Sequence, residues 1–275
     1  MSIVCRNKHS CDNLYKEKVV VLDSNVLINI IKAINRIITD KALPRDRQFD
    51  EFISILEDFL VSIRLCAHNE RIHVSRQVFS QEMNPINHAS TLRQTPLFNA
   101  IIGDNNTYYH RVDTILNRHL TIFPSAIPAS DILQLKRSLR YSGSTGFNMP
   151  SDNDLSLLAL TSKVGANVGG VLLTDDTNIQ EASETLQRSR YVTLSKRRID
   201  TQKIVSAGSL SYLSEVYHCC RLLSPRFFAV FDVLSNYVKG KSSSLPDRIT
   251  RNYERQFTQV IRSISDIPKQ SPWRI

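Results

Sequence analysis

The chain has 275 residues, of which 41% are hydrophobic and 22% are charged. A chain of this size and composition can bury a large core, which excludes an intrinsically disordered protein. No window reaches the roughly 18 consecutive apolar residues of a membrane span, and no apolar stretch follows the basic start as in an export signal. The five cysteines therefore favour a reduced compartment over a disulfide framework. We expect a cytoplasmic protein without membrane contact.

The net charge of +9 is concentrated toward the C-terminus. Residues 195–275 contain 14 of the 35 Lys and Arg residues but 6 of the 26 Asp and Glu residues. Such a local basic excess favours a polyanionic partner, RNA or DNA before an anionic membrane surface. Near the N-terminus, Cys5, His9 and Cys11 are three candidate metal ligands without a fourth, which is a weak indication of a metal site.

Hydrophobic patterns predict the first elements. Residues 18–23 form a β-branched run typical of a strand covered on both faces. The next segment, 27–38, repeats apolar residues three and four positions apart and is predicted to be a helix. After a break at Leu43, a second helix has its apolar stripe at 49–63.

The middle of the chain continues the alternation of strands and helices. Residues 71–74 are predicted to be a short strand, and a helix begins near Arg76. Helical periodicity recurs between 97 and 120 and again at 129–140, and the glycines and proline of 143–150 predict a loop. The resulting order of elements favours an α/β fold with a parallel sheet flanked by helices.

The stretch 151–182 has the most informative pattern. Its helix, from Asp154, is apolar on nearly all sides and should be buried against a sheet. Glycines at 165–170 end this helix, a strand follows at 171–174, and another helix begins near Thr177.

The remaining chain becomes basic and helical. Residues 191–194 are the last strand that we predict, as an outer strand. We therefore divide the chain into an N-terminal segment (1–17), an α/β domain (18–194) and a basic helical extension (195–275) without a further strand.

Acidic residues occupy matching positions after the predicted strands. Asp23 ends the first strand, Asp154 opens the buried helix, and Asp175 and Asp176 follow the next strand. Glu82 lies about two turns into the helix after the second strand. Because sites in open α/β sheets form beyond the carboxyl ends of the strands, these side chains should converge. A cation must then offset their repulsion, and carboxylate oxygens suit Mg²⁺ or Mn²⁺.

The same acids also have a purely structural interpretation. Asp154 fits the last position of a capping box, and Asp23 and Asp176 can cap the helices that follow them. Taken singly, each acid is explained as well by a cap as by a ligand. Their joint placement with Asn25 and Thr174, which can orient a carboxylate or a bound water, favours a site.

Three runs resemble the PIN-domain nucleases, a family of VapC-type toxins and RNA-processing ribonucleases. They are VVVLDSNVLINII at 19–31, DLSLLALTSKVGA at 154–166 and VLLTDD at 171–176. The resemblance covers roughly residues 18–194 and implies a PIN-like sheet and a Mg²⁺- or Mn²⁺-dependent endoribonuclease. The chain departs from the small toxins in its length and its basic extension, which puts a toxin role in doubt.

The resemblance also implies roles for individual residues. The catalytic acids would be Asp23, Glu82, Asp154 and Asp176. Asp175 would be an accessory metal ligand, and Asn25 and Thr174 would support the site. Glu82 matches by position alone, without a specific motif. Hydrolysis of this kind leaves 3′-hydroxyl and 5′-phosphate ends, whereas histidine catalysis through the 2′-hydroxyl would leave a cyclic phosphate.

Positive charge must surround such an acidic pocket if it is to bind a phosphate. The candidate clusters, each of which can equally be a solvated surface, are Lys136, Arg137 and Arg140; Lys196, Arg197 and Arg198; and Arg248, Arg251 and Arg255.

Several functions remain open at the level of sequence. The alternatives to a ribonuclease are a non-catalytic RNA- or protein-binding scaffold, in which the acids are only caps, and a structure-specific DNA nuclease. An Asp-nucleophile phosphatase is disfavoured because no second aspartate stands two residues after Asp23, and a dinucleotide-binding enzyme because no glycine-rich turn follows the first strand. A toxin, a defence effector and an RNA-maturation enzyme are all compatible with the chain, as are an antitoxin-like inhibitor and a homo-oligomer.

Overall fold

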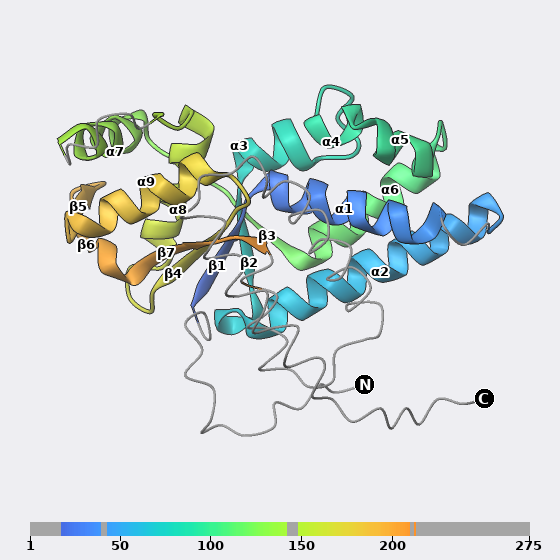
Figure 1. Cartoon of the computed structure of the whole chain (residues 1–275), viewed down its shortest axis with the longest axis horizontal. Coiled ribbons are helices and arrows are strands. Elements are labelled where there is room, and N and C mark those ends of the chain that lie inside the picture. The colour runs from blue at the N-terminus through green and yellow to red at the C-terminus, as the bar shows by residue number, and fades with distance from the viewer. Residues whose placement is uncertain (1–17, 40–42, 142–147, 210–211, 213–275) are drawn as a thin grey trace, which may run out of the picture.

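The computed structural model describes residues 18–39, 43–141, 148–209 and Tyr212 (Figure 1). Its centre is a five-stranded sheet in the order β3-β2-β1-β4-β7, with every neighbouring pair parallel. The α/β prediction, with a parallel sheet flanked by helices, is confirmed. The strands of this sheet are β1 (Val19–Leu22), β2 (Ile72–Ser75), β3 (Leu120–Phe123), β4 (Gly170–Leu173) and β7 (Ile204–Ala207).

Helices lie on both sides of the sheet (Figure 1). One group contains α1 (Ser24–Thr39), α2 (Arg45–Cys66), α5 (Pro96–Ile102) and α6 (Asn106–His119), and the other contains α7 (Ala129–Tyr141), α8 (Asp152–Val164) and α9 (Thr177–Arg188). Shorter helices are α3 (Arg76–Val78), which continues into a π-helical turn at Phe79–Met83, and α4 (Thr91–Gln94). Because both faces are covered, β1 and β4 are buried along their whole length and read as continuous apolar runs.

The direction in which strands are added reverses between β1 and β4. The chain passes from β1 to β2 and β3 on one side, then returns to place β4 and β7 on the other side of β1. Right-handed crossovers place the connecting helices of the two halves on opposite faces. The loops after β1 and β4 therefore diverge at the carboxyl edge of the sheet, the place where open α/β sheets bind ligands.

The helix that the sequence predicts to be buried against the sheet is α8, and this prediction is confirmed. Residues 155–162 are all buried, and the helix packs against β1 and β4. It ends where the chain must turn tightly into β4. A Cβ built on Gly165 would lie 2.6 Å from the Cα of Gly170, so neither helix nor strand could keep its place with a larger residue at position 165.

Three strands were missed by the sequence patterns. β3 follows α6 directly, and β6 (Arg197–Asp200) and β7 lie beyond residue 194. The prediction that no strand follows residue 194 is therefore wrong, and the main sheet continues through β7. The predicted outer strand exists as β5 (Tyr191–Leu194), but it pairs with β6 in a separate antiparallel ribbon.

Several predictions fall outside the described residues. These are the metal ligands proposed near the N-terminus, the loop between 143 and 147, and the helices expected in the basic extension beyond Tyr212. Within the part of the chain that the structure describes, no helix combines the length and apolar character needed to cross a membrane.

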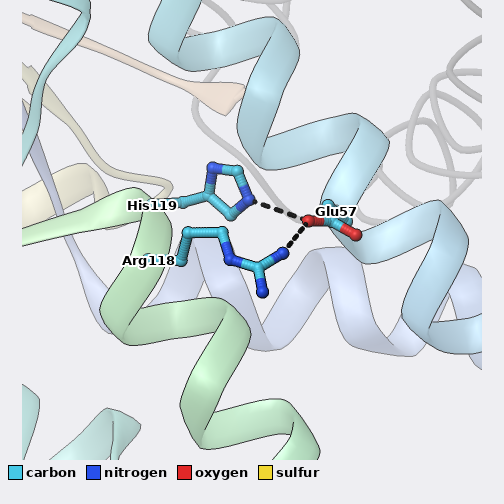
Figure 2. A network of polar contacts seen from close by, with 3 residues as sticks. All are labelled: Glu57, Arg118 and His119. Carbon is cyan, nitrogen blue, oxygen red and sulfur yellow. Dashed lines mark hydrogen bonds and ion pairs between the residues drawn. The ribbon is translucent and has the colours of Figure 1, made fainter.

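A polar network joins α6 to α2 on the side of the sheet away from α8 (Figure 2). Glu57 of α2 accepts a hydrogen bond from Nη1 of Arg118 at 2.8 Å, and its Oε1 lies 3.3 Å from Nε2 of His119. His119 is buried, and this burial lowers its pKa. Burial raises the pKa of Glu57, but the hydrogen bonds from His119 and Arg118 outweigh burial and hold that pKa below its usual value.

Replacing Glu57 with Gln is expected to lower the free energy of unfolding at pH 7 by about 1 kcal/mol, because two charge-assisted contacts are lost. A carboxyl with a depressed pKa stabilises the fold above its unfolded pKa and loses that effect as the pH falls. The difference between variant and wild type should therefore shrink at pH 4. Urea denaturation at both pH values measures this difference, with Glu181→Gln at an exposed position of α9 as the control. Equal stability of Glu57→Gln and wild type at pH 7 would refute the assignment.

Candidate functional site

Asp23 and Thr174 meet across the point where the strand order reverses. Asp23 follows β1, and its backbone N–H donates to the carbonyl oxygen of Leu173, the last residue of β4, at 3.0 Å. The hydroxyl of Thr174 donates to Oδ2 of Asp23 at 2.7 Å. Both side chains are buried, with Asp23 4% exposed and Thr174 0%. Two residues that are 151 positions apart thus share one buried hydrogen bond.

Asn25 and the backbone of Asp176 fix the direction of that hydrogen bond. Oγ1 of Thr174 accepts from Nδ2 of Asn25 at 3.2 Å and from the backbone N–H of Asp176 at 3.1 Å. Because a hydroxyl has a single proton, accepting these two bonds leaves that proton for Asp23. Oδ1 of Asn25 in turn accepts from the backbone N–H of Asp175 at 3.1 Å. The supporting roles predicted for Asn25 and Thr174 match this geometry.

The negative charges of two carboxylates from other elements, Glu82 and Asp154, act on Asp23. Its pKa is raised to about 6, first by burial and then by the negative charges of Asp154 and Glu82. The hydrogen bonds from Thr174 and from the backbone of Asn25 act in the opposite direction but do not compensate. Of the other predicted catalytic acids, Glu82 and Asp154 thus lie near enough to Asp23 for their charges to raise its pKa.

Glu82, which no sequence motif supported, belongs to this group. It lies in the π-helical turn after α3, a type of turn that is frequent at functional sites. Ser24 donates to Oε2 of Glu82, and Nδ2 of Asn153 donates to Oε1 at 3.0 Å. Nε2 of Gln77 in turn donates a hydrogen bond to Oδ1 of Asn153 at 2.7 Å, which fixes the Asn153 amide. Glu82 is thus held from both sides.

Asp154 forms the predicted helix cap and also lies near Asp23. Its Oδ2 accepts the backbone N–H of Ser151 at 2.9 Å, and the Ser151 hydroxyl accepts the backbone N–H of Asp154 at 3.3 Å. This is the capping box expected at the start of α8. The cap uses one carboxylate oxygen and places Asp154 close enough to Asp23 to raise the pKa of Asp23.

The two acids after β4 have other partners. Asp175 accepts from Nδ2 of Asn29 at 2.9 Å, and from the backbone and hydroxyl of Ser209 at 2.7 and 2.9 Å. Oδ1 of Asp176 accepts the N–H groups of Asn178 and Ile179 and so caps α9. Neither Asp175 nor Asp176 appears among the charges that shift the pKa of Asp23.

The oxygen ligands of these acids suit a hard divalent cation, but their side chains are not grouped as in a metal site. Asp23, Glu82 and Asp154 offer only oxygen ligands, and a buried carboxylate with two like charges nearby is stabilised by a cation. Within residues 18–39, 43–141 and 148–209, however, no three Asp, Glu, His or Cys side chains are grouped in the manner of a metal site. Binding an ion would therefore require these side chains to move closer together.

The predicted cationic residues of α7 differ in their surroundings. Lys136 forms an ion pair with Asp152, at the start of α8, so part of its charge is offset. Arg137 and Arg140 are exposed. Arg248, Arg251 and Arg255 lie outside the described residues.

The second cluster lies in the β5–β6 hairpin, which is anchored to α7. Asp131 accepts both the backbone N–H and the hydroxyl of Ser195 at 2.7 Å, and pairs with Lys163 at 2.7 Å. The turn that this anchor holds presents Lys196, Arg197 and Arg198, all exposed. The guanidinium of Arg198 lies 3.8 Å from the centre of the Tyr191 ring.

Sequence reasoning missed four polar residues around the site: Ser24, Asn29, Asn153 and Ser209. Ser24 and Asn153 directly adjoin predicted acids, and Asn29 stands one helical turn after Asn25, so a search for neighbours on the same helix face would have found these three. Ser209 gave no such signal, because it follows the strand β7 that the patterns did not predict.

The resemblance to PIN-domain nucleases rests on three short runs and on the position of Asp23 and Asp154 beside a parallel sheet. The fold and the positions of Asp23, Asn25 and Thr174 are compatible with it. Neither a protein-family model, nor a curated protein, nor a solved structure matches this chain.

Proposed function

We propose that this protein is a Mg²⁺- or Mn²⁺-dependent endoribonuclease that hydrolyses RNA phosphodiester bonds. One observation carries the proposal: Asp23 is buried at the point where the strand order reverses, and Glu82 and Asp154 add to its raised pKa. Such a group of like charges costs stability, so it needs a reason other than folding. Perturbed carboxylates at the ligand-binding edge of an α/β sheet are characteristic of active sites.

Asp23, Glu82 and Asp154 would hold the divalent ion. When bound there, Mg²⁺ or Mn²⁺ provides Lewis-acid chemistry, which activates water and stabilises charge on a phosphate. Thr174 and Asn25 keep the carboxylate of Asp23 in one orientation. The remaining acids, Asp175 and Asp176, shape the loop after β4 through their contacts with Ser209 and the start of α9.

Neutral donors hold Glu82 and Asp154 in place. Ser24 of α1 and Asn153 of α8 donate to the two oxygens of Glu82. The capping box holds Asp154 through Oδ2 alone. Within the part of the chain that the structure describes, the donors to these three acids are neutral side chains and backbone N–H groups, which leaves the charge of the acids for a metal.

RNA is the proposed substrate because the described surface carries exposed cations at the β5–β6 hairpin and on α7, and the chain is basic overall. Lys196, Arg197 and Arg198 would contact the phosphate backbone. An antitoxin-like inhibitor, a homo-oligomer and a cytoplasmic location remain part of the proposal without a structural observation that supports them.

The chemistry of the products tests the proposal. Full-length protein with 5′-labelled single-stranded RNA and Mn²⁺ should yield fragments with 3′-hydroxyl and 5′-phosphate ends, and EDTA should prevent cleavage. Sensitivity of the products to a 5′-phosphate-dependent exonuclease identifies these ends, with flapped DNA as the parallel substrate. Cyclic-phosphate ends, or cleavage that persists in EDTA, would reject the metal-dependent mechanism. Preferential cleavage of the flapped DNA would replace RNA with DNA as the substrate.

A non-catalytic scaffold is the second candidate, and the caps favour it. Asp154 and Asp176 complete helix caps, and Asp175 is fully engaged with Asn29 and Ser209. In that case the acids serve folding, and the basic surface alone binds RNA or a protein. The scaffold does not explain Asp23, whose burial next to two carboxylates lowers stability at neutral pH.

A further inference from the structure

A groove of about 510 Å³ begins beside the acidic site and follows α1. One wall is the face of α1 that carries Asn25, Ile28, Asn29 and Lys32. The opposite wall comes from α4 and the start of α5, with Thr91, Gln94, Thr95 and Pro96. Its volume is within the range of ligand-binding pockets, roughly 300–1,000 Å³.

The groove is continuous with the acidic site through two amides. Asn25 lines the groove and also donates to Thr174, and Asn29 lines it and donates to Asp175. These two residues and Lys32 lie four and three positions apart, so they share one helix face. Asn25 and Lys32 are seven positions apart, which corresponds to roughly 10 Å along the helix axis.

The lining has the chemistry of a nucleic-acid strand site. No carboxylate is among the residues that line the groove, and Lys32 adds one positive charge. The amides of Asn29 and Gln94 and the hydroxyl of Thr91 can pair with base edges. Ile28 and Pro96 offer apolar surface against which a base can lie. Each amide has more donor and acceptor positions than the structure uses, so Asn25 and Asn29 can keep their contacts with the loop after β4 and bind a ligand too.

We propose that this groove binds the single-stranded RNA segment adjoining the bond that is cut, with Lys32 on a backbone phosphate and the amides of Asn29 and Gln94 on the bases. The inference rests on the proposed function and names its substrate as single-stranded. Sequence-selective RNA binding uses unpaired bases, because the deep groove of an RNA duplex is closed to side chains. Lys32 is seven residues after Asn25 on α1, so it can hold a phosphate of the strand farther along the groove than the contact between Asn25 and Thr174.

Two groove variants test the inference, measured as binding of a labelled single-stranded RNA to the full chain in EDTA by fluorescence anisotropy. Lys32→Gln should weaken binding on the order of fivefold, the loss expected for one exposed charge contact, and reduce the salt slope by about 0.7. Thr91→Trp fills the groove without changing charge and should weaken binding similarly. Lys203→Gln is the matched control, because this exposed lysine precedes β7 at the opposite edge of the sheet. Circular dichroism of each variant verifies folding.

The outcomes separate this inference from the ribonuclease proposal. Weaker binding by both groove variants, with Lys203→Gln unchanged, supports the groove even if the wild type cleaves nothing, and that second result would reject the nuclease alone. If both groove variants bind the RNA as tightly as the wild type, the inference is overturned, and a protein becomes the candidate ligand of the groove. That result would not contradict RNA cleavage by the wild type. Equal weakening in Lys32→Gln and Lys203→Gln, with Thr91→Trp unaffected, overturns it as well, since only net charge would then matter.

Discussion

Asp23→Asn is expected to abolish Mn²⁺-dependent RNA cleavage while stabilising the fold. Metal ions contribute several kcal/mol to such reactions, and each 1.36 kcal/mol is tenfold in rate, so the loss should be on the order of 10³-fold. Asn keeps the hydrogen bond from Thr174 but carries no charge for a cation. Cleavage of labelled RNA by variant and wild type, each at saturating Mn²⁺, measures the rate effect.

The stability effect has the opposite sign because of the raised pKa of Asp23. A carboxyl whose pKa is about 6 in the fold and 3.8 ordinarily binds more protons in the folded state than in the unfolded state between these two pH values. The fold therefore loses stability as the pH rises through this window, by roughly 3 kcal/mol in total. Asn removes this cost, so the variant should be more stable than wild type at pH 8 and gain little at pH 4. Urea denaturation of both proteins in EDTA at pH 8 and at pH 4 measures this difference in unfolding free energy.

Asp176→Asn is the matched control for this experiment. Asn caps a helix about as well as Asp, so α9 and the unfolding free energy should be unchanged. The same substitution tests the role that the family resemblance assigns to Asp176. Because Asp176 does not contribute to the pKa shift of Asp23, we expect a smaller loss of activity than for Asp23→Asn. If Asp23→Asn, or the variant that combines Asp23→Asn with Asp176→Asn, cleaves RNA at the wild-type rate, the acids have a structural role only.

The fold was predictable where elements are buried on both faces and less so at the edges of the sheet. β1 and β4 are central, with neighbours on either side, and their apolar runs were visible in the sequence. The two strands of the sheet that were missed, β3 and β7, are its edges, where only one neighbour is present and half-buried residues interrupt the pattern. Their short runs resemble loop or helix ends.

The positions of the acids in the site could be predicted from the sequence, but the hydrogen-bond donors that hold them could not. Asp23 and Asp154 stand at element boundaries that follow from hydrophobic patterns, so their convergence could be inferred. Which side chain holds which acid depends on rotamers and on the π-helical turn at Glu82, and no periodicity encodes either. For the same reason, the sequence does not show which partners Asp175 and Asp176 have. Both follow β4, but one turns toward Ser209 and the other toward the start of α9.

Divalent ions are expected to raise the unfolding temperature of the wild type and to leave Asp23→Asn unchanged. At 100 times its dissociation constant, a bound ion stabilises the folded state by about 2.7 kcal/mol, which corresponds to roughly 5–10 °C for a chain of this size. The shift should be large at pH 8 and small at pH 5, because below its pKa of about 6 Asp23 must lose a proton before it can bind an ion.

Thermal unfolding with Mn²⁺, with Mg²⁺ and with EDTA measures this shift at both pH values. Glu82→Gln should reduce it, because the charge of Glu82 acts on Asp23. Asp176→Asn should leave most of it, because the Asp176 carboxylate caps α9. An equal shift in wild type and Asp23→Asn would place the ion elsewhere on the protein. A shift absent from the wild type at pH 8 would mean that the three carboxylates do not bind an ion, and the charge cluster would then need an explanation within folding alone.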